Sequence, residues 1–208
     1  MRQWTLSLAV LALVAAPVLA GKHNKAVSVG DKAPAIAGLA AASADGTKDM
    51  TVNLADVKED VVVVAFLANH CPAVIGSQDR LVEVVNAYKG KSVKFIGVCC
   101  SSESSYGEED GIPAIKKAIK DGKHNLTYGY DPKGTIGQAY GAARTPEFFV
   151  LDKTRTIRYM GAMDDSPNNE AKVTKTYLKP AIDAVLANET VETPETRPAG
   201  CGIPYASK

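Results

Sequence analysis

The sequence predicts an α/β fold with a central mixed sheet and helices on both faces. The apolar run from Val61 to Leu67 shows no polar alternation, which is typical of a parallel strand covered on both sides. A helical pattern and a second β-branched run, Val93 to Cys100, follow it. This βαβ order requires a parallel pair with a right-handed crossover. Two later apolar runs, 148–152 and 156–161, flank a short polar turn and predict an antiparallel hairpin.

The other elements follow from residue patterns in chain order. Turn residues and an Ala/Ser/Gly-rich stretch predict a loop from Gly30 to Thr47, and residues 52–56 predict a short strand or turn. Apolar residues at helical spacing from Val74 to Tyr88 predict the crossover helix, which Gly90 ends. Further helices are predicted at 112–119, 135–140 and 170–187.

Two features of the C-terminal part involve proline: Pro180 in the last predicted helix and the proline-rich tail after it. Pro180 either kinks the long helix from about Glu170 to Ala187 or opens its second half. The tail from Thr190 to Lys208 is rich in Pro and Thr. We predict that it is unstructured except where Cys201 docks.

The N-terminus has the pattern of an export signal. Arg2 precedes an apolar core from Leu6 to Ala16, and small residues lead to a predicted cleavage point after Ala20. The apolar stretch is short for a membrane span, which argues against the alternative of a retained N-terminal anchor. We therefore predict a signal peptide (1–20), one domain (21–188) and a tail (189–208) in an exported protein, periplasmic or secreted, without stable membrane insertion after cleavage.

The charge balance argues against polyanionic partners. The chain has 24 Lys and Arg against 23 Asp and Glu, and loss of residues 1–20 removes Arg2 and no acidic residue. The mature chain is then formally neutral. We therefore expect neither nucleic acid nor an anionic membrane as partner.

Four cysteines, at positions 71, 99, 100 and 201, allow two interpretations. In an exported protein they can form two structural disulfides. The adjacency of Cys99 and Cys100 weakens this interpretation, because vicinal disulfides are strained and rare. The alternative is a reactive thiol with a distant partner.

Cys71 is the candidate reactive thiol because it lies where the strand 61–67 ends and a helix begins. Unpaired N–H groups and the positive end of the helix dipole favour a thiolate at such a position. His70 could lower the pKa of the thiol further if its ring is protonated and close to the sulfur. The alternatives are an inert, buried Cys71 and a surface His70 without a role.

Thr145-Pro146 immediately precedes the predicted strand 147–152. Proline cannot donate to the sheet, and a cis peptide bond there turns the Thr145 backbone toward the cysteine loop, where it can pair with an extended peptide. An ordinary trans proline at a strand start is the alternative.

Metal binding by Cys71 and His70 is disfavoured. Adjacent residues at a helix start rarely face the same ion, and His23 and His124 follow no ligand spacing. We expect no metal and no cofactor.

Four ordered motifs resemble the peroxiredoxin-like branch of the redoxin (AhpC/TSA-type) family, whose members have the thioredoxin fold. They are Ala68-Asn69-His70-Cys71-Pro72, Tyr140-Gly141-Ala142-Ala143-Arg144-Thr145-Pro146-Glu147, Tyr159-Met160-Gly161-Ala162-Met163-Asp164-Asp165 and Gly200-Cys201-Gly202-Ile203. The likeness spans roughly residues 28 to 205. It implies a thioredoxin-like fold, thiol chemistry at Cys71 and a substrate groove shaped by Arg144, Thr145 and Pro146.

The departures from the family pattern bear on mechanism. Position 68, where the resemblance expects a first cysteine, is Ala, so resolution within the loop cannot occur. A true peroxiredoxin carries Thr three residues and Pro seven residues before its cysteine, and here those places hold Ala68 and Val64. Its arginine aligns near Pro146, where Arg144 could substitute. Peroxidase chemistry therefore lacks most of its usual electrostatic support.

The partner of Cys71 must come from elsewhere in the chain. Cys99 and Cys100 end a neighbouring strand, and at most one of them can point toward the cysteine loop because side chains alternate. Alternatively, Cys99 and Cys100 are small apolar residues that fill the core at the end of the strand. Cys201 lies on a tail that can deliver a thiol, so we favour Cys201 over Cys100 as the resolving cysteine.

The sequence thus predicts an exported thiol–disulfide oxidoreductase or peroxiredoxin-like antioxidant protein. Cys71 is the reactive thiol, and His70 and the helix start stabilise its thiolate. Its expected partners are a thiol or disulfide substrate protein, or peroxide, and an external thiol reductant. The alternative is a non-catalytic binding module that has lost the first cysteine of its redox turn. The enzyme interpretation requires a sulfur at position 71 that reagents can reach.

Overall fold

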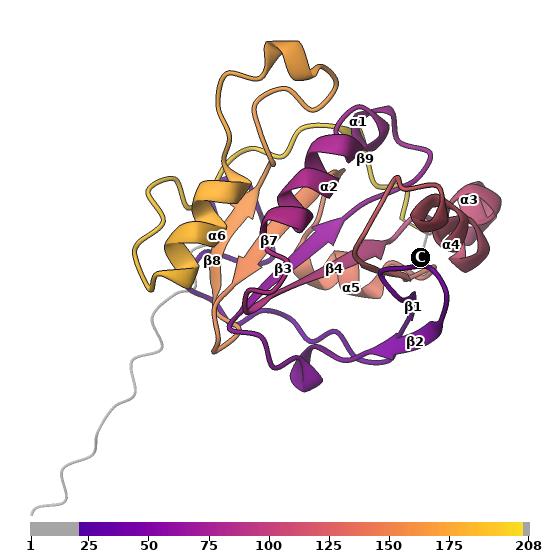
Figure 1. Cartoon of the computed structure of the whole chain (residues 1–208), viewed down its shortest axis with the longest axis horizontal. Coiled ribbons are helices and arrows are strands. Elements are labelled where there is room, and N and C mark those ends of the chain that lie inside the picture. The colour runs from indigo at the N-terminus through magenta and orange to yellow at the C-terminus, as the bar shows by residue number, and fades with distance from the viewer. Residues whose placement is uncertain (1–20, 206–208) are drawn as a thin grey trace, which may run out of the picture.

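The computed structural model describes residues 21–205, and the predicted signal peptide lies outside them. Seven strands form one mixed sheet in the order β2-β1-β5-β4-β3-β7-β8 (Figure 1). Their bounds are β1 Leu39–Ala42, β2 Asp49–Val52, β3 Val61–Phe66, β4 Val93–Cys99, β5 Thr127–Tyr130, β7 Glu147–Leu151 and β8 Ile157–Gly161. β3 runs parallel to β4, and β4 runs parallel to β5. The other pairs are antiparallel, which confirms the predicted mixed sheet.

β3 lies at the centre of the fold because both of its faces are covered. All six of its residues are buried, and alternate residues belong to two different apolar clusters. Val63 faces one cluster, whereas Val64 faces the other and stands opposite Ile96 of β4 and Phe149 of β7. The unbroken apolar run in the sequence therefore reflects burial on two sides.

Helices cover both faces of the sheet, as predicted. The cluster that includes Val63 is completed by α2 (Gln78–Ala87), α4 (Ile112–Lys120) and α6 (Leu178–Leu186). Figure 1 shows α2 and α6 on the same side of the sheet. The opposite cluster is completed by α5 (Thr135–Tyr140) and by the segment before β1.

Three strands (β1, β2 and β5) and the helix α3 (Glu103–Asp110) were not predicted. β1 lies inside the Ala/Ser/Gly-rich stretch that was expected to be a loop, and it pairs with β2 through a turn in which Asp45 accepts hydrogen bonds from Ser43 and Thr47. A 3-10 turn, Leu54–Asp56, follows β2. β5 and α3 also lack a sequence signal, since α3 has little apolar periodicity.

The predicted crossover helix is divided into α1 (Pro72–Ile75) and α2. Gly76 lies at the break, packed so closely that an added Cβ would come 3.1 Å from the Cα of Asn168 and from the carbonyl oxygen of Pro167. The Ser77 hydroxyl donates to the Ala73 carbonyl at 2.7 Å and compensates for part of the interrupted backbone ladder. This break places the end of α1 against the loop after β8.

The predicted helix 170–187 forms only in its second half. Residues 170–172 make a 3-10 turn, and α6 begins at Leu178. Pro180 lies in the first turn of α6, where the N–H that proline lacks would have no partner within the helix. The proline therefore opens the second half, one of the two predicted possibilities.

Asp164, in the loop after β8, is buried, whereas its neighbour Asp165 is exposed. The Asp164 carboxylate accepts a hydrogen bond from Nε of Arg80 at 2.9 Å, and Arg80 also donates to the Gly76, Ser166 and Pro167 carbonyls. The pair ties the loop after β8 to the start of α2.

The tail is ordered along the sheet edge, contrary to the prediction that it is unstructured outside its docking point. Thr196 N–H donates to the Met160 carbonyl at 3.0 Å, and Met160 N–H donates to the Pro194 carbonyl at 3.1 Å. Farther on, β9 (Cys201–Gly202) pairs with β6 (Arg144–Thr145). Within residues 21–205, no helix has the length and apolarity needed to cross a membrane.

Candidate functional site

Cys71 lies at the junction of β3 and α1, as the sequence predicts. Two buried residues, Leu67 and Ala68, follow β3, and the Cys71 N–H donates back to the Ala68 carbonyl at 3.1 Å. Pro72 begins α1, where its missing N–H costs nothing. Because α1 has only four residues, its dipole acts mainly through the unpaired N–H groups of the first turn.

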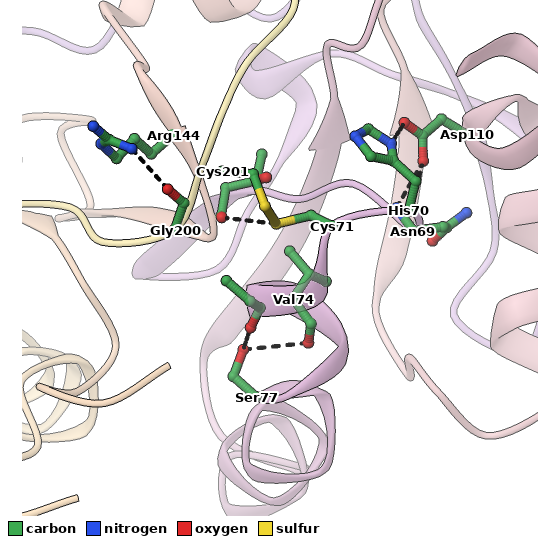
Figure 2. The surroundings of a disulfide bond; sticks show 11 residues. Asn69, His70, Cys71, Val74, Ser77, Asp110, Arg144, Gly200 and Cys201 are labelled. Carbon is green, nitrogen blue, oxygen red and sulfur yellow. Dashed lines mark hydrogen bonds and ion pairs between the residues drawn. A yellow bond between two sulfur atoms is a disulfide. The ribbon is translucent and has the colours of Figure 1, made fainter. Parts of the chain in front are cut away.

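A disulfide joins Cys71 to Cys201, 130 residues later in the chain (Figure 2). The two Cα atoms are 6.1 Å apart, within the usual range for such a bond. Cys201 reaches this position on β9, and the structure thus brings together the two cysteines that the sequence analysis favoured.

Cys71 is 0% exposed in this disulfide state. The tail provides part of the cover: Cys201 is bonded to the Cys71 sulfur, and Gly200 packs against Ala73 of α1 and the Thr145 carbonyl. External reagents therefore reach the sulfur of Cys71 only after this segment moves.

Gly200 makes the close approach of the tail possible. Its φ of +142° is a conformation that residues with a side chain rarely adopt, and a Cβ there would collide with the Thr145 carbonyl oxygen. A Cβ at Gly202, on the other side of Cys201, would meet nothing within 4 Å.

Two of the three predicted groove residues, Arg144 and Thr145, contact the tail. The Thr145–Pro146 peptide bond is cis, and the Thr145 carbonyl oxygen lies 3.2 Å from the Cys71 sulfur. Thr145 stands opposite Cys201 in the pairing of β6 and β9. The Arg144 guanidinium donates to the Gly200 carbonyl at 2.7 Å, as Figure 2 shows. An extended segment of the same chain thus occupies the position predicted for a substrate peptide.

His70 points away from the disulfide. Its Nδ1 lies 2.6 Å from Oδ2 of Asp110, and its ring stacks on Tyr106 with centroids 3.6 Å apart. Figure 2 shows this pair on the other side of the loop from Cys201. In the described chain the imidazole makes no hydrogen bond to the Cys71 sulfur. Its predicted stabilisation of the thiolate and the alternative of a residue without a role therefore both stay predictions, although the ring is held in place by Asp110 and Tyr106.

Asp110 anchors the cysteine loop through hydrogen bonds to the Asn69 N–H and the His70 ring. The residue is completely buried, and its Oδ1 accepts the Asn69 N–H at 2.7 Å in addition to the His70 contact. A buried carboxylate needs such partners. Asp110 ends α3, a helix that the sequence did not predict, so its contact with a residue forty positions earlier had no sequence signal.

Cys99 and Cys100 are buried free thiols on opposite faces of the sheet. Cys99 shares the apolar cluster of Cys71, and burial together with the nearby Asp110 charge raises its pKa to about 12. Burial and the Asp131 carboxylate raise the pKa of Cys100 as well. Both residues are protonated at neutral pH, which agrees with their alternative role as small core residues.

Glu147 is a site residue whose role the sequence analysis did not identify, although it belongs to the Thr-Pro-Glu segment. It is 3% exposed, and its Oε2 accepts the N–H groups of Ala143 at 2.8 Å and Arg144 at 3.2 Å. Burial raises the pKa of its carboxyl to about 7 against the effect of these hydrogen bonds. The carboxylate fixes the turn that presents β6 to the tail.

No group of three His, Cys, Asp or Glu side chains within residues 21–205 is placed to hold a metal ion. The groups next to the disulfide segment are instead the Thr145 carbonyl, near the Cys71 sulfur, and the Arg144 guanidinium, bonded to the Gly200 carbonyl. This arrangement can align an extended peptide beside the cysteine pair, where thiol–disulfide exchange with a peptide cysteine is chemically possible.

Comparisons with known proteins agree with this geometry. A family model described as Redoxin matches residues 28–178. An uncharacterized conserved protein from Geobacillus kaustophilus is 32% identical, with a TM-score of 0.76 over 86% of this chain and 93% of that chain. A hypothetical protein from Sinorhizobium meliloti 1021 is 27% identical, with a TM-score of 0.77 over 89% and 98%.

A putative thiol:disulfide interchange protein DsbE from Chlorobium tepidum shares the fold, with 24% identity and a TM-score of 0.55 over 76% of this chain and 98% of that chain. The sequence has no significant match among curated proteins. The sheet order and these neighbours confirm the thioredoxin-like fold.

Proposed function

Because the chain belongs to the redoxin family, we propose that it is an exported thiol–disulfide oxidoreductase that uses Cys71 and Cys201 as its redox pair. The observation that carries the proposal is the Cys71–Cys201 disulfide beside Thr145 and Pro146. Cys201 supplies the second sulfur that position 68, an alanine, lacks. The pair can therefore store two electrons although the redox turn has a single cysteine.

In the reducing direction, the Cys71 thiolate attacks one sulfur of a partner disulfide. A Cys71–partner bond forms, the partner disulfide breaks, and the second partner sulfur leaves as a thiolate that takes up a proton. The Cys201 thiolate then attacks the Cys71 sulfur, which closes the disulfide and releases the first partner sulfur. Two electrons have passed from the protein to the partner.

Regeneration requires an external dithiol, and burial indicates where it attacks. Cys71 is completely buried whereas Cys201 is partly exposed, so the reductant thiolate approaches the Cys201 sulfur first. That attack releases Cys71 as a thiolate. The second thiol of the reductant then breaks the mixed disulfide on Cys201, which frees Cys201 and oxidises the reductant.

Peroxide is a weaker candidate substrate. The positions that carry Thr and Pro in a true peroxiredoxin hold Ala68 and Val64, and the guanidinium of Arg144 is bonded to the Gly200 carbonyl. A developing charge on peroxide oxygen would find few donors here. These observations favour disulfide exchange over peroxidase activity.

A non-catalytic module is the other alternative from the sequence. Its groove beside Pro146 is the one that β9 fills, and the occupant brings a cysteine into bonding contact with Cys71. A module that only binds peptides has no need of that cysteine. The disulfide therefore favours the oxidoreductase.

Export and the three-part division of the chain (1–20, 21–188 and 189–208) belong to the same proposal. Disulfides persist in oxidising compartments, so the Cys71–Cys201 bond supports a periplasmic or secreted protein. Detection of the mature N-terminus by mass spectrometry of extracellular or periplasmic fractions tests this part.

Turnover with a dithiol reductant tests the activity. We expect the mature protein to accelerate reduction of a protein disulfide by dithiothreitol, and we expect Cys71→Ser to abolish this activity. Cys201→Ser should accumulate a mixed disulfide on Cys71, whereas Cys100→Ser should behave as the wild type. Failure to turn over either a protein disulfide or hydrogen peroxide, together with peptide binding, would favour the module.

A further inference from the structure

The last residues of the described chain fill a second, separate pocket beyond the disulfide. After Cys201, the tail continues along the loop before β6, where Ile203 N–H donates to the Ala143 carbonyl at 3.2 Å. Tyr205 then enters a socket formed by Gly134, Gly137 and Ala142, and its hydroxyl donates to the Ala142 carbonyl at 2.6 Å. The segment is thus held at two points four residues apart.

The socket depends on two glycines in or beside α5. A Cβ at Gly134 would collide with the ring of Tyr205, and a Cβ at Gly137 would come 2.5 Å from its hydroxyl oxygen. Gly134 has a positive φ, which gives it a second reason to be glycine, but Gly137 lies within the helix. The Cys100 sulfur would lie 2.7 Å from the same Cβ, so the Tyr205 ring and Cys100 together leave no room for a side chain at Gly137.

Backbone contacts fix the direction of the segment. Ser102 N–H donates to the Pro204 carbonyl at 3.0 Å, Arg144 binds the Gly200 carbonyl, and Thr145 stands opposite Cys201. Most of these contacts use main-chain atoms of the bound segment. An extended peptide of another protein can therefore make them as well.

A partner that forms a mixed disulfide with Cys71 must place its sulfur where the Cys201 sulfur lies. With the tail docked, Cys71 is completely buried and its sulfur lies 3.2 Å from the Thr145 carbonyl oxygen, so we expect the partner segment to approach along β6 as the tail does. Its fourth residue after the cysteine then reaches the socket. The tail and the partner cannot be seated together.

We propose that the socket of Gly134, Gly137 and Ala142 is a specificity site for the partner. The partner is an extended protein segment with a cysteine followed four residues later by tyrosine, and the tail sequence from Gly200 to Tyr205 is the internal mimic of that segment. The inference rests on the proposed thiol–disulfide exchange at Cys71. Partner and tail occupy the site in turn, before and after Cys201 resolves the mixed disulfide.

Activated peptides test the socket without altering it. The protein is the mature Cys201→Ser variant, and the probes are the peptide Gly-Cys-Gly-Ile-Pro-Tyr and versions with Phe or Ala in place of Tyr, each with thionitrobenzoate bonded to its cysteine. Attack of the Cys71 thiolate on the peptide sulfur forms the mixed disulfide and expels coloured thionitrobenzoate. We expect the Tyr peptide to react about tenfold faster than the Ala peptide, with the Phe peptide between them.

The parent disulfide of thionitrobenzoate, which has no peptide, separates the two proposals. Equal rates for the three peptides, with normal reaction of this reagent at Cys71, would overturn the socket and leave the exchange chemistry intact. A Cys71 that reacts with none of them would overturn the proposed function.

A binding measurement tests the socket independently of sulfur chemistry. Fluorescent peptides with Ser in place of Cys are titrated into the Cys201→Ser/Tyr205→Ala variant, whose own tail leaves the socket empty. We expect the Tyr peptide to bind about tenfold more tightly than the Ala peptide, as followed by anisotropy. Equal affinities would again contradict the socket.

Discussion

Thr145 stands directly opposite Cys201 in the antiparallel pairing of β6 and β9. The resemblance to redoxins assigns Thr145 to the substrate groove, and this groove holds the chain's own cysteine segment. The delivery of Cys201 and the binding of an extended peptide thus use the same backbone edge. The stability of the disulfide therefore depends on how well the tail fits this edge.

Gly200→Ala should weaken the docked state of the tail. The φ of +142° and the contact with the Thr145 carbonyl leave no room for a methyl group, and such backbone strain costs about 1–3 kcal/mol. At a fixed ratio of reduced to oxidised glutathione, we expect the equilibrium constant for the Cys71–Cys201 disulfide to fall about tenfold. Alkylation of free thiols followed by peptide mapping measures it.

Gly202→Ala is the matched control, because Gly202 also adjoins Cys201 but has open space around it and an ordinary φ. We expect its disulfide equilibrium to stay near that of the wild type. Equal effects of the two substitutions would show that the tail tolerates a side chain at position 200, contrary to the fit described above.

The elements predicted with a strong periodic pattern are present, and the missed ones lack such a pattern. The apolar run of β3 and the hairpin of β7 and β8 follow from burial, which the sequence records directly. β1 consists mainly of alanine, and its strand conformation comes from pairing with β2 and β5. Such tertiary pairing has no local signal.

The site was predictable at the positions that carry the chemistry but not at those that support them. Cys71, Cys201 and the Thr145–Pro146 turn belong to recognisable motifs. Asp110 and Tyr106 lie on α3, and their contacts with His70 arise only when the chain folds. Unlike the cysteines, these side chains belong to no motif that would indicate their pairing.

Reduced, native protein should react with iodoacetamide at Cys71 and Cys201 and not at Cys99. The Cys71 label should appear fastest if its thiolate is stabilised as predicted. With its pKa raised from 9.0 to about 12, Cys99 has about 1,000-fold less thiolate at neutral pH than an ordinary thiol, and it is buried. Mass spectrometry of timed samples measures the order of labelling, and denatured protein provides the control in which all four cysteines react. Uniform labelling of the native protein would contradict the assignment.

Asp110→Ala should destabilise the cysteine loop. The substitution leaves the Asn69 N–H and the His70 imidazole without their buried acceptor, and the loss of one partner from a buried pair costs about 3 kcal/mol. Urea unfolding followed by circular dichroism measures the loss. Asp110→Asn keeps an acceptor and should lose less, and exposed Glu109→Ala should change little. A small effect of Asp110→Ala would mean that the loop does not depend on this anchor.

Glu147 should make the stability of the protein decrease between about pH 4.5 and pH 7. Burial raises its pKa in the folded protein from 4.5 to about 7. In this interval the native state keeps the proton that the unfolded chain releases, so the free energy of unfolding falls as pH rises. A difference of this size amounts to about 3 kcal/mol at most.

The contribution of Glu147 is isolated by subtracting the pH profile of Glu147→Gln from that of the wild type. Subtraction is necessary because burial lowers the pKa of His124 to about 4, which gives an opposite slope over nearly the same interval. The difference should show stability lost as pH rises toward 7, whereas exposed Glu83→Gln should reproduce the wild-type profile. Parallel profiles for wild type and Glu147→Gln would show that the carboxyl ionises normally and that hydrogen bonds from Ala143 and Arg144 outweigh its burial.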